Sequence, residues 1–194
     1  MKERKLTTPD GYDLSSQRLV ASFASQLDDQ LRRLKEAVAE LSTTHFEWQP
    51  HPGVNTVGML LAHIAVAEAF WINVAPAGIP LEPDGDNLIL RIIGIRMDDD
   101  GLPLKPSGHH PATLSGKTLA DYLNILDKMR AATNAAIRTW HDADLDHDYT
   151  LRDATVTRSW TLYHILEHLA AHYGQILLMK HLMRDAGVLE HQTK

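Results

Sequence analysis

Three histidines recur at intervals of four residues near the C-terminal end of the chain: His164, His168 and His172. In a helix, residues four apart lie one turn above each other, so that two adjacent imidazoles can bind one metal ion. Residues eight apart are separated by ~12 Å along the helix axis, which is too far for both to reach the same ion. At most one adjacent pair can therefore act, and His168 belongs to it.

The helical phase of this segment indicates which pair faces inward. Its apolar residues define one arc, formed by Leu162, Ile165, Leu166, Leu169, Tyr173, Ile176 and Leu177. His172 lies at the edge of that arc, His168 lies about 40° further round, and His164 lies further still, toward solvent. The sequence therefore predicts His168 and His172 as the inward pair.

A third imidazole lies in residues 57–72, a segment that is apolar nearly all round and is therefore expected to be buried on most sides. His63 is the only polar side chain on its face of this segment, and a buried ring without a partner costs ~1–3 kcal/mol. A core histidine bonded to a carbonyl or carboxylate is the alternative. Because a second helix offers a chelating pair, we predict a metal site on His63, His168 and His172. Three neutral imidazoles leave coordination positions open, which is typical of catalytic sites.

Four segments with a helical period must position these residues. Each would be ~30–40 Å long, so that all four can lie side by side. The sequence predicts an all-α protein, a four-helix bundle that forms a single domain over residues 1–194. Ser15–Ser16 and Ser159 are the expected N-caps of the first and last helices. The predicted helices are 16–41, 56–75, 118–140 and 160–185.

A long insertion, residues 76–116, separates the second and third predicted helices and is rich in Pro, Gly and Asp. Insertions of this length commonly form lids or oligomer contacts. Within it, Leu88–Met97 is expected to form a short apolar helix, and Leu88–Ile95 is the expected contact of a homodimer. Further along the chain, Thr150–Thr157 is expected to form an irregular hairpin.

Composition narrows the class of protein. The formal net charge of -6 and the absence of a Lys/Arg run argue against a nucleic-acid partner. The chain has no cysteine, which excludes disulfides, thiolate metal ligands and a cysteine nucleophile. We find no run of ~18 apolar residues that would span a membrane, and the polar residues 1–10 do not resemble a signal peptide. A soluble, cytoplasmic protein is expected.

Two stretches resemble a known family. Residues 48–64, WQPHPGVNTVGMLLAHI, and residues 168–175, HLAAHYGQ, resemble the DinB/YfiT-like metalloenzymes (DinB-like domain). The resemblance implies an up-down-down-up four-helix bundle, frequently a homodimer, with one divalent metal ion on three histidines. Carried over position by position, these ligands are His63, His168 and His172. The insertion matches no part of the family that we can place.

The resemblance also implies a function, a metal-dependent enzyme that transfers a low-molecular-weight thiol or isomerises a small-molecule substrate with its help. A divalent ion stabilises a thiolate, and in a chain without cysteine that thiol must come from a cofactor. Imidazole ligands suit Zn, Ni or Fe alike. Two alternatives stay open: a metal-dependent hydrolase, and a stress-related protein that binds metal without turnover. No catalytic residue is assigned beyond the ligands.

A competing motif overlaps the ladder, because residues 164–168 also match H-x-x-E-H. In that interpretation His164 is a ligand and Glu167 is the general base. The motif requires a further acidic ligand well downstream, where only Asp185 and Glu190 remain, and a strand edge to hold the substrate. We therefore favour a solvated position for Glu167.

Other polar residues receive simpler interpretations. Asp98–Asp100 is expected to form a solvated turn, because its spacing does not fit a calcium loop. His109 and His110 are expected to be exposed, with a lid that carries one of them to the metal as the alternative. Glu68 is expected to pair with a basic side chain or to orient a neighbouring group, without a catalytic role. Gln175 lies one turn beyond the ladder, either bonded near the site or on the helix surface.

Overall fold

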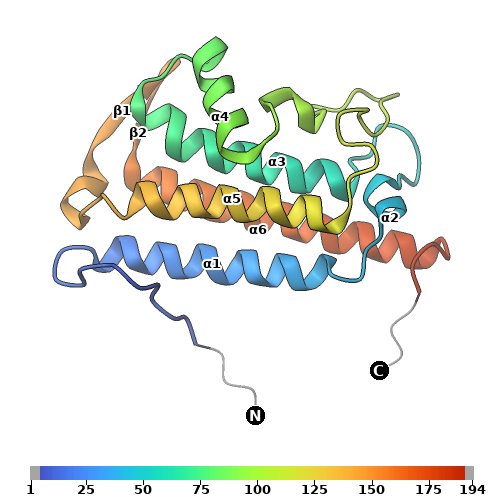
Figure 1. The fold of residues 1–194 in the computed structure, drawn as a ribbon, viewed down its shortest axis with the longest axis horizontal. Helices are drawn as coiled ribbons and strands as arrows, with labels where there is room; N and C mark the ends of the chain where they lie inside the picture. The colour runs from blue at the N-terminus through green and yellow to red at the C-terminus, as the bar shows by residue number, and fades with distance from the viewer. Residues whose placement is uncertain (1–4, 191–194) are drawn as a thin grey trace.

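The computed structural model describes residues 5–190 and is mostly helical, with one small antiparallel hairpin. The first four and last four residues of the predicted domain lie outside the described part. Four long helices lie side by side (Figure 1), and two short helices join them. In chain order the helices are α1 (Arg18–Val38), α2 (Thr43–Glu47), α3 (Val57–Ala69), α4 (Asp86–Ile93), α5 (Leu119–Ile137) and α6 (Arg158–Asp185).

The helix ends depart from the prediction in ways that have physical causes. At the start of α1, the carboxylate of Asp142 accepts hydrogen bonds from the backbone N–H groups of Leu19 and Val20, at 2.9 and 3.1 Å. This acidic group comes from the 3-10 turn at Asp142–Asp146, which is distant in the sequence, and takes the place of the expected serine cap. At α6 the cap is Thr157, which accepts a bond from the N–H of Trp160, so the expected cap at Ser159 is wrong.

Helix α3 is the central element, and eleven of its residues are buried. It packs against α4, α5 and α6, and a π-helical turn at Phe70–Val74 and a short 3-10 turn at Ala75–Ala77 extend it. The combined segment Val57–Ala77 is long and apolar enough to cross a membrane, but 72% of its most apolar window is buried inside the protein. It packs as the core helix of a globular domain.

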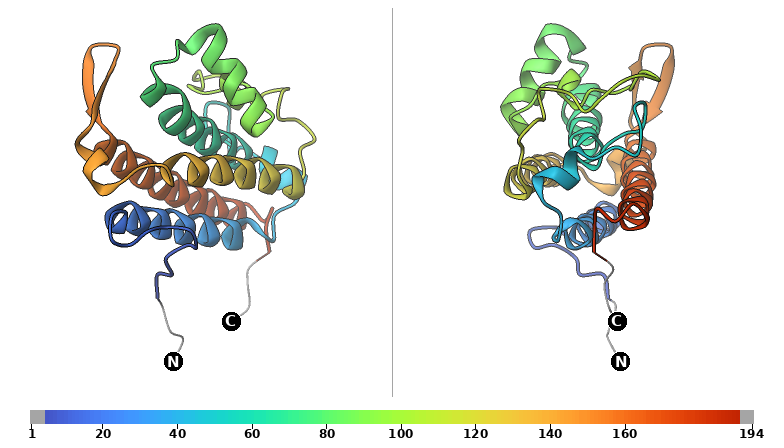
Figure 2. Two further views of the ribbon diagram at one scale, coloured as in Figure 1. Left: turned by 60° about the vertical axis from the view of Figure 1, so that its left-hand side comes forward. Right: turned by 90° about the vertical axis from the view of Figure 1, so that its right-hand side faces the viewer.

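The insertion folds back over α3. Helix α4 packs on α3 and α5 through Ile89 and Ile93, and Ile95 is buried directly after it. A 3-10 turn at Met97–Asp100 then packs on α3, and the connection crosses the outer side of that helix (Figure 2). The predicted apolar helix is thus present, with its isoleucines buried in the chain's own core. The homodimer contact stays a prediction.

The predicted hairpin is also present, as strands β1 (Asp148–Leu151) and β2 (Ala154–Thr157). Tyr149 pairs with Val156 in its register, and the Tyr149 hydroxyl lies 2.5 Å from the hydroxyl of Thr161. Because β2 runs straight into the cap of α6, the hairpin fixes where the helix that carries the histidine ladder begins.

Candidate metal centre

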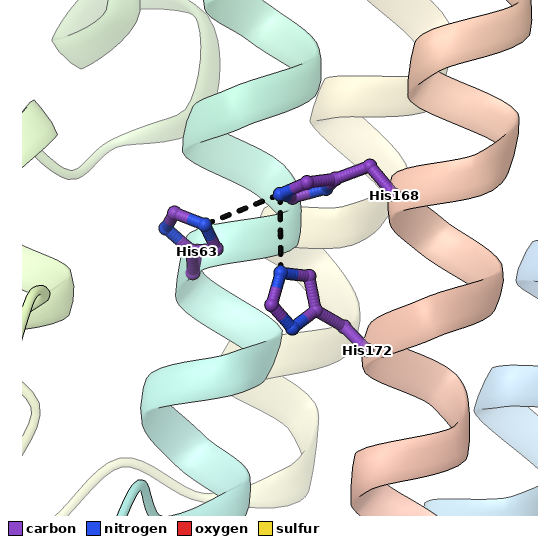
Figure 3. A group of neighbouring side chains, drawn as sticks. All are labelled: His63, His168 and His172. Atoms are coloured by element: carbon purple, nitrogen blue, oxygen red, sulfur yellow. Dashed lines mark hydrogen bonds between the residues drawn. The ribbon is translucent and has the colours of Figure 1, made fainter.

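Helices α3 and α6 bring three imidazole rings to a common point (Figure 3). The Nε2 atom of His168 lies 3.2 Å from that of His63 and 3.1 Å from that of His172. One ring nitrogen from each residue lies within 4.8 Å of the other two. The three residues singled out from the sequence, one on α3 and two on α6, are therefore gathered in one place.

The outer two rings are held by acceptors on their other nitrogen. His63 Nδ1 lies 2.8 Å from a carboxylate oxygen of Asp100, and His172 Nδ1 lies 2.8 Å from the amide oxygen of Gln175. Because these oxygens accept, each Nδ1 carries the proton, and in a neutral ring the lone pair then lies on Nε2. Two lone pairs thus point at His168 Nε2. That atom can donate at most one proton, so the rings cannot fully satisfy one another.

The electrostatic setting keeps the α6 rings neutral. Burial, together with the neighbouring rings of His172, His63 and His164, lowers the pKa of His168 to about 3. Burial also lowers the pKa of His172, against the opposing effect of the hydrogen bond that its Nδ1–H donates to Gln175. Near neutral pH both rings are therefore uncharged and have the form that binds metal.

The donor set fits a divalent ion. Tetrahedral ligands at ~2.0–2.1 Å from zinc lie ~3.3 Å apart, close to the two shorter nitrogen–nitrogen separations seen here. Converging lone pairs on neutral imidazoles are the donors that zinc, nickel and iron accept. A small inward movement of His63 and His172 toward each other would complete the geometry.

Asp100 is a site residue that the sequence analysis missed. It was expected in a solvated turn, but only 3% of its surface is exposed, and its second oxygen accepts the N–H of Leu102 at 2.9 Å. The expectation holds for the exposed neighbour Asp98 and is wrong for Asp100. A carboxylate behind a ligating histidine fixes the tautomer and raises the basicity of the ring.

His164 was expected to face solvent, but it is half-buried. Its ring stacks on Trp160 at 4.7 Å between centroids and meets the edge of Trp71 at 4.9 Å. Burial lowers the pKa of His164. It lies outside the group of three, and Glu167 is exposed. This arrangement agrees with our preference against the H-x-x-E-H interpretation.

The loop histidines have separate fates. His109 is exposed as expected, whereas His110 is half-buried and its Nδ1 lies 2.8 Å from the hydroxyl of Thr56. The expectation of exposure is therefore wrong for His110. This residue attaches the end of the insertion to the residue that caps α3, and it is not part of the three-histidine group.

Glu68 has the basic partner that was expected. Its carboxylate lies 3.0 Å from the guanidinium of Arg130 on α5, and both side chains are almost fully buried. Arg130 also lies 3.4 Å from Asp28 on α1. The ion pair thus links three helices and takes no part in the histidine group.

A cavity of about 300 Å³ opens beside the histidine group. His63 and His168 lie in its wall, together with His164. A ligand in this cavity would therefore lie next to the point at which the imidazole nitrogens converge.

These features define a helical protein with three convergent histidines between two core helices. A family model described as the DinB superfamily matches residues 26–176. The chain belongs to the DinB superfamily.

Two solved structures show the same fold. A conserved protein from Enterococcus faecalis is 18% identical, with a TM-score of 0.58 over 86% of this chain and 95% of that one. A DinB-like protein from Bacillus cereus is also 18% identical, with a TM-score of 0.51 over 89% of this chain and 95% of that one. At this identity the likeness concerns the fold alone. No curated protein matches the chain.

Proposed function

We propose that the protein binds one divalent metal ion on His63, His168 and His172 and uses it as an enzyme on a small-molecule substrate. The observation that carries this proposal is the convergence of neutral imidazole nitrogens whose lone pairs have no sufficient partner among themselves. Membership of the DinB superfamily supports it. The reaction that we propose is transfer of a low-molecular-weight thiol, or a thiol-assisted isomerisation.

Each part of the chain has a task in this proposal. A bound divalent ion would supply a Lewis acid that stabilises a thiolate. The three rings would hold the ion, while Asp100 and Gln175 fix the orientation of two of them. Since the chain has no cysteine, the sulfur comes from a separate molecule. The adjoining cavity gives that molecule a place beside the ligands.

The number of protein ligands also favours catalysis over simple metal storage. Three protein ligands leave positions open on the ion, and closed structural sites lack such positions. A hydrolase that uses metal-activated water is the second candidate, supported by the same open positions. A metal-binding protein without turnover is the third.

We propose that the four long helices form the up-down-down-up bundle that the resemblance implies. In Figure 1, α1 and α6 run in one direction and α3 and α5 in the other, which supports this topology. We further propose that the insertion, residues 76–116, acts as a lid, because its Asp100 reaches His63. A cytoplasmic homodimer completes the proposal.

Thermal unfolding of metal-free protein tests the function. Zinc alone, phenylmethanethiol alone and both together are added in separate samples, with a chelator control for each. We expect stabilisation by zinc, further stabilisation by the thiol only when zinc is present, and loss of both effects with chelator. Stabilisation by zinc without any effect of the thiol would favour metal binding alone. Nickel and iron are tested in place of zinc, and the absence of stabilisation by any of the three ions would contradict the proposal.

A further inference from the structure

The walls of the cavity beside the histidine group are mostly apolar. Its apolar lining comes from α3, from the π-helical turn that extends it, and from the insertion. These residues are Val66, Ala67, Phe70, Trp71, Met97 and Leu102. Such a surface favours ligand groups that gain by leaving water, at roughly 25 cal/mol per Å² of apolar area.

The charged side chains at the cavity have one sign. Asp98 and Asp100 contribute to its lining, and among the described residues none of those that line it is a lysine or arginine. Asp100 is engaged by His63 and the N–H of Leu102, whereas Asp98 is exposed at the edge. A carboxylate or phosphate held in the cavity away from the metal position would meet like charge and no lysine or arginine from the lining.

The cavity is large enough to hold an aromatic ring. An apolar cavity of about 150 Å³ can hold benzene, and the cavity here measures about 300 Å³. Trp71 and His164 present ring surfaces to it. Aromatic ligands gain from edge and stacked contacts with such rings beyond the area that they bury.

We propose that this cavity is the substrate pocket and that it takes an uncharged apolar group, preferably aromatic, on a ligand whose donor atom reaches the metal. The inference rests on the proposed function, because the donor atom needs a metal on the three histidines. It limits the substrate class, since a ligand that carries a carboxylate on the group entering the pocket is disfavoured.

Three related thiols test the inference on protein loaded with Co²⁺. The probes are phenylmethanethiol and its para-carboxamide and para-carboxylate derivatives, the last two being close in size. Thiolate binding is followed by the sulfur-to-cobalt charge-transfer absorption. We expect the carboxylate to bind at least about ten-fold more weakly than the carboxamide, because like charges are brought together. Equal affinity, or tighter binding of the carboxylate, would overturn the inference.

A variant that fills the pocket gives an independent test. Ala67 lies in the lining, one helical turn from His63, and Ala67→Leu would occupy part of the volume. We expect phenylmethanethiol to bind about ten-fold more weakly or worse, with Co²⁺ binding retained. Ala131→Leu on the exposed side of α5 is the matched control and should bind like wild type.

The outcomes distinguish a failure of the proposed function from a failure of the pocket assignment. If wild-type protein takes up no Co²⁺, the proposed function fails and this inference fails with it. If Co²⁺ binds but Ala67→Leu leaves thiol affinity unchanged, only the pocket assignment is wrong. Should Ala67→Leu not fold, the ranking of the three thiols on wild-type protein still decides.

Discussion

Helix α3 carries two polar side chains in an otherwise apolar sequence, His63 and Glu68, and the two have opposite fates. Glu68 is 2% exposed and is matched by the guanidinium of Arg130 at 3.0 Å. His63 donates a hydrogen bond to Asp100 through one nitrogen, and its ring also meets two more imidazoles and the cavity. One helix thus carries a carboxylate, Glu68, whose charge is neutralised within the protein. It also carries a ring, His63, in a group of imidazoles that has more nitrogen lone pairs than protons to share among them.

The difference separates structure from function. A buried ion pair completed within the chain needs nothing from outside, so that its removal should affect folding. A group of convergent lone pairs is completed only by something added, so that its removal should affect binding. Each of the site and ion-pair variants below is therefore expected to change either metal binding or stability, but not both.

The largest effect is expected for His168→Ala, which removes the central ring of the group. We expect zinc affinity to fall about 1,000-fold or more, since complete zinc sites are worth about 10–16 kcal/mol and one of three protein ligands is lost. Isothermal titration with zinc measures the change. His164→Ala removes the neighbouring ladder residue and should keep wild-type affinity; equal losses in both variants would contradict the assignment of ligands.

Glu68→Ala should affect the stability of the fold and leave metal binding unchanged. It leaves Arg130 buried with a weakened partner set, and we expect the free energy of unfolding to fall by about 3–5 kcal/mol. Urea denaturation measures this loss, and zinc stoichiometry of the folded variant should be unchanged. The double variant Glu68→Met, Arg130→Leu should recover most of the stability. If the folded Glu68→Ala protein lost metal binding, the claim that Glu68 is structural and separate from the metal site would be contradicted.

Asp100→Asn sharpens the comparison within the site. The variant keeps the shape of the side chain but removes the carboxylate charge that accepts the hydrogen bond from His63 Nδ1. We expect zinc affinity to fall about 10–100-fold, as for other groups that orient metal-bound histidines. Asp98→Asn removes one negative charge from the same turn without a bond to His63 and serves as the control. If both variants weakened zinc binding equally, the effect of Asp100 would come from its negative charge alone and not from its hydrogen bond to His63.

The smallest effect concerns pH and His110. Burial lowers the pKa of His110 below its ordinary value of 6.5 in the folded protein. The unfolded chain therefore takes up a proton first as the pH falls, so that this residue costs stability on acidification below about pH 6.5. In unfolding experiments at pH 7 and pH 5, His110→Gln should lose less stability than wild type. His109→Gln, at the exposed neighbour, should follow wild type.

Local pattern was enough to predict the histidine group. The phase of α6 selects His168 and His172, and the uniformly apolar surroundings of His63 mark it as a buried group that needs a partner. Both arguments use only a few helical turns, over which spacing in sequence translates directly into spacing in the structure.

Outside the histidine group, partners that lie far apart in the sequence could not be chosen in this way. Asp100 meets His63 across 37 residues, and Arg130 meets Glu68 across 62. Neither pairing follows from periodicity, because it depends on how the insertion and α5 pack on α3. The cap of α1 by Asp142 has the same origin. Helix boundaries were therefore approximate, and the role of Asp100 required coordinates.

The central claim is tested most directly by the metal itself. Protein purified without nickel resin is loaded with zinc, dialysed, and measured by elemental analysis and by X-ray absorption at the zinc edge. We predict one zinc per chain, with three imidazole nitrogens at about 2.0–2.1 Å and water in the remaining positions. Zinc that washes out, or a bound ion without imidazole scattering, would contradict the claim that these three rings form a metal centre.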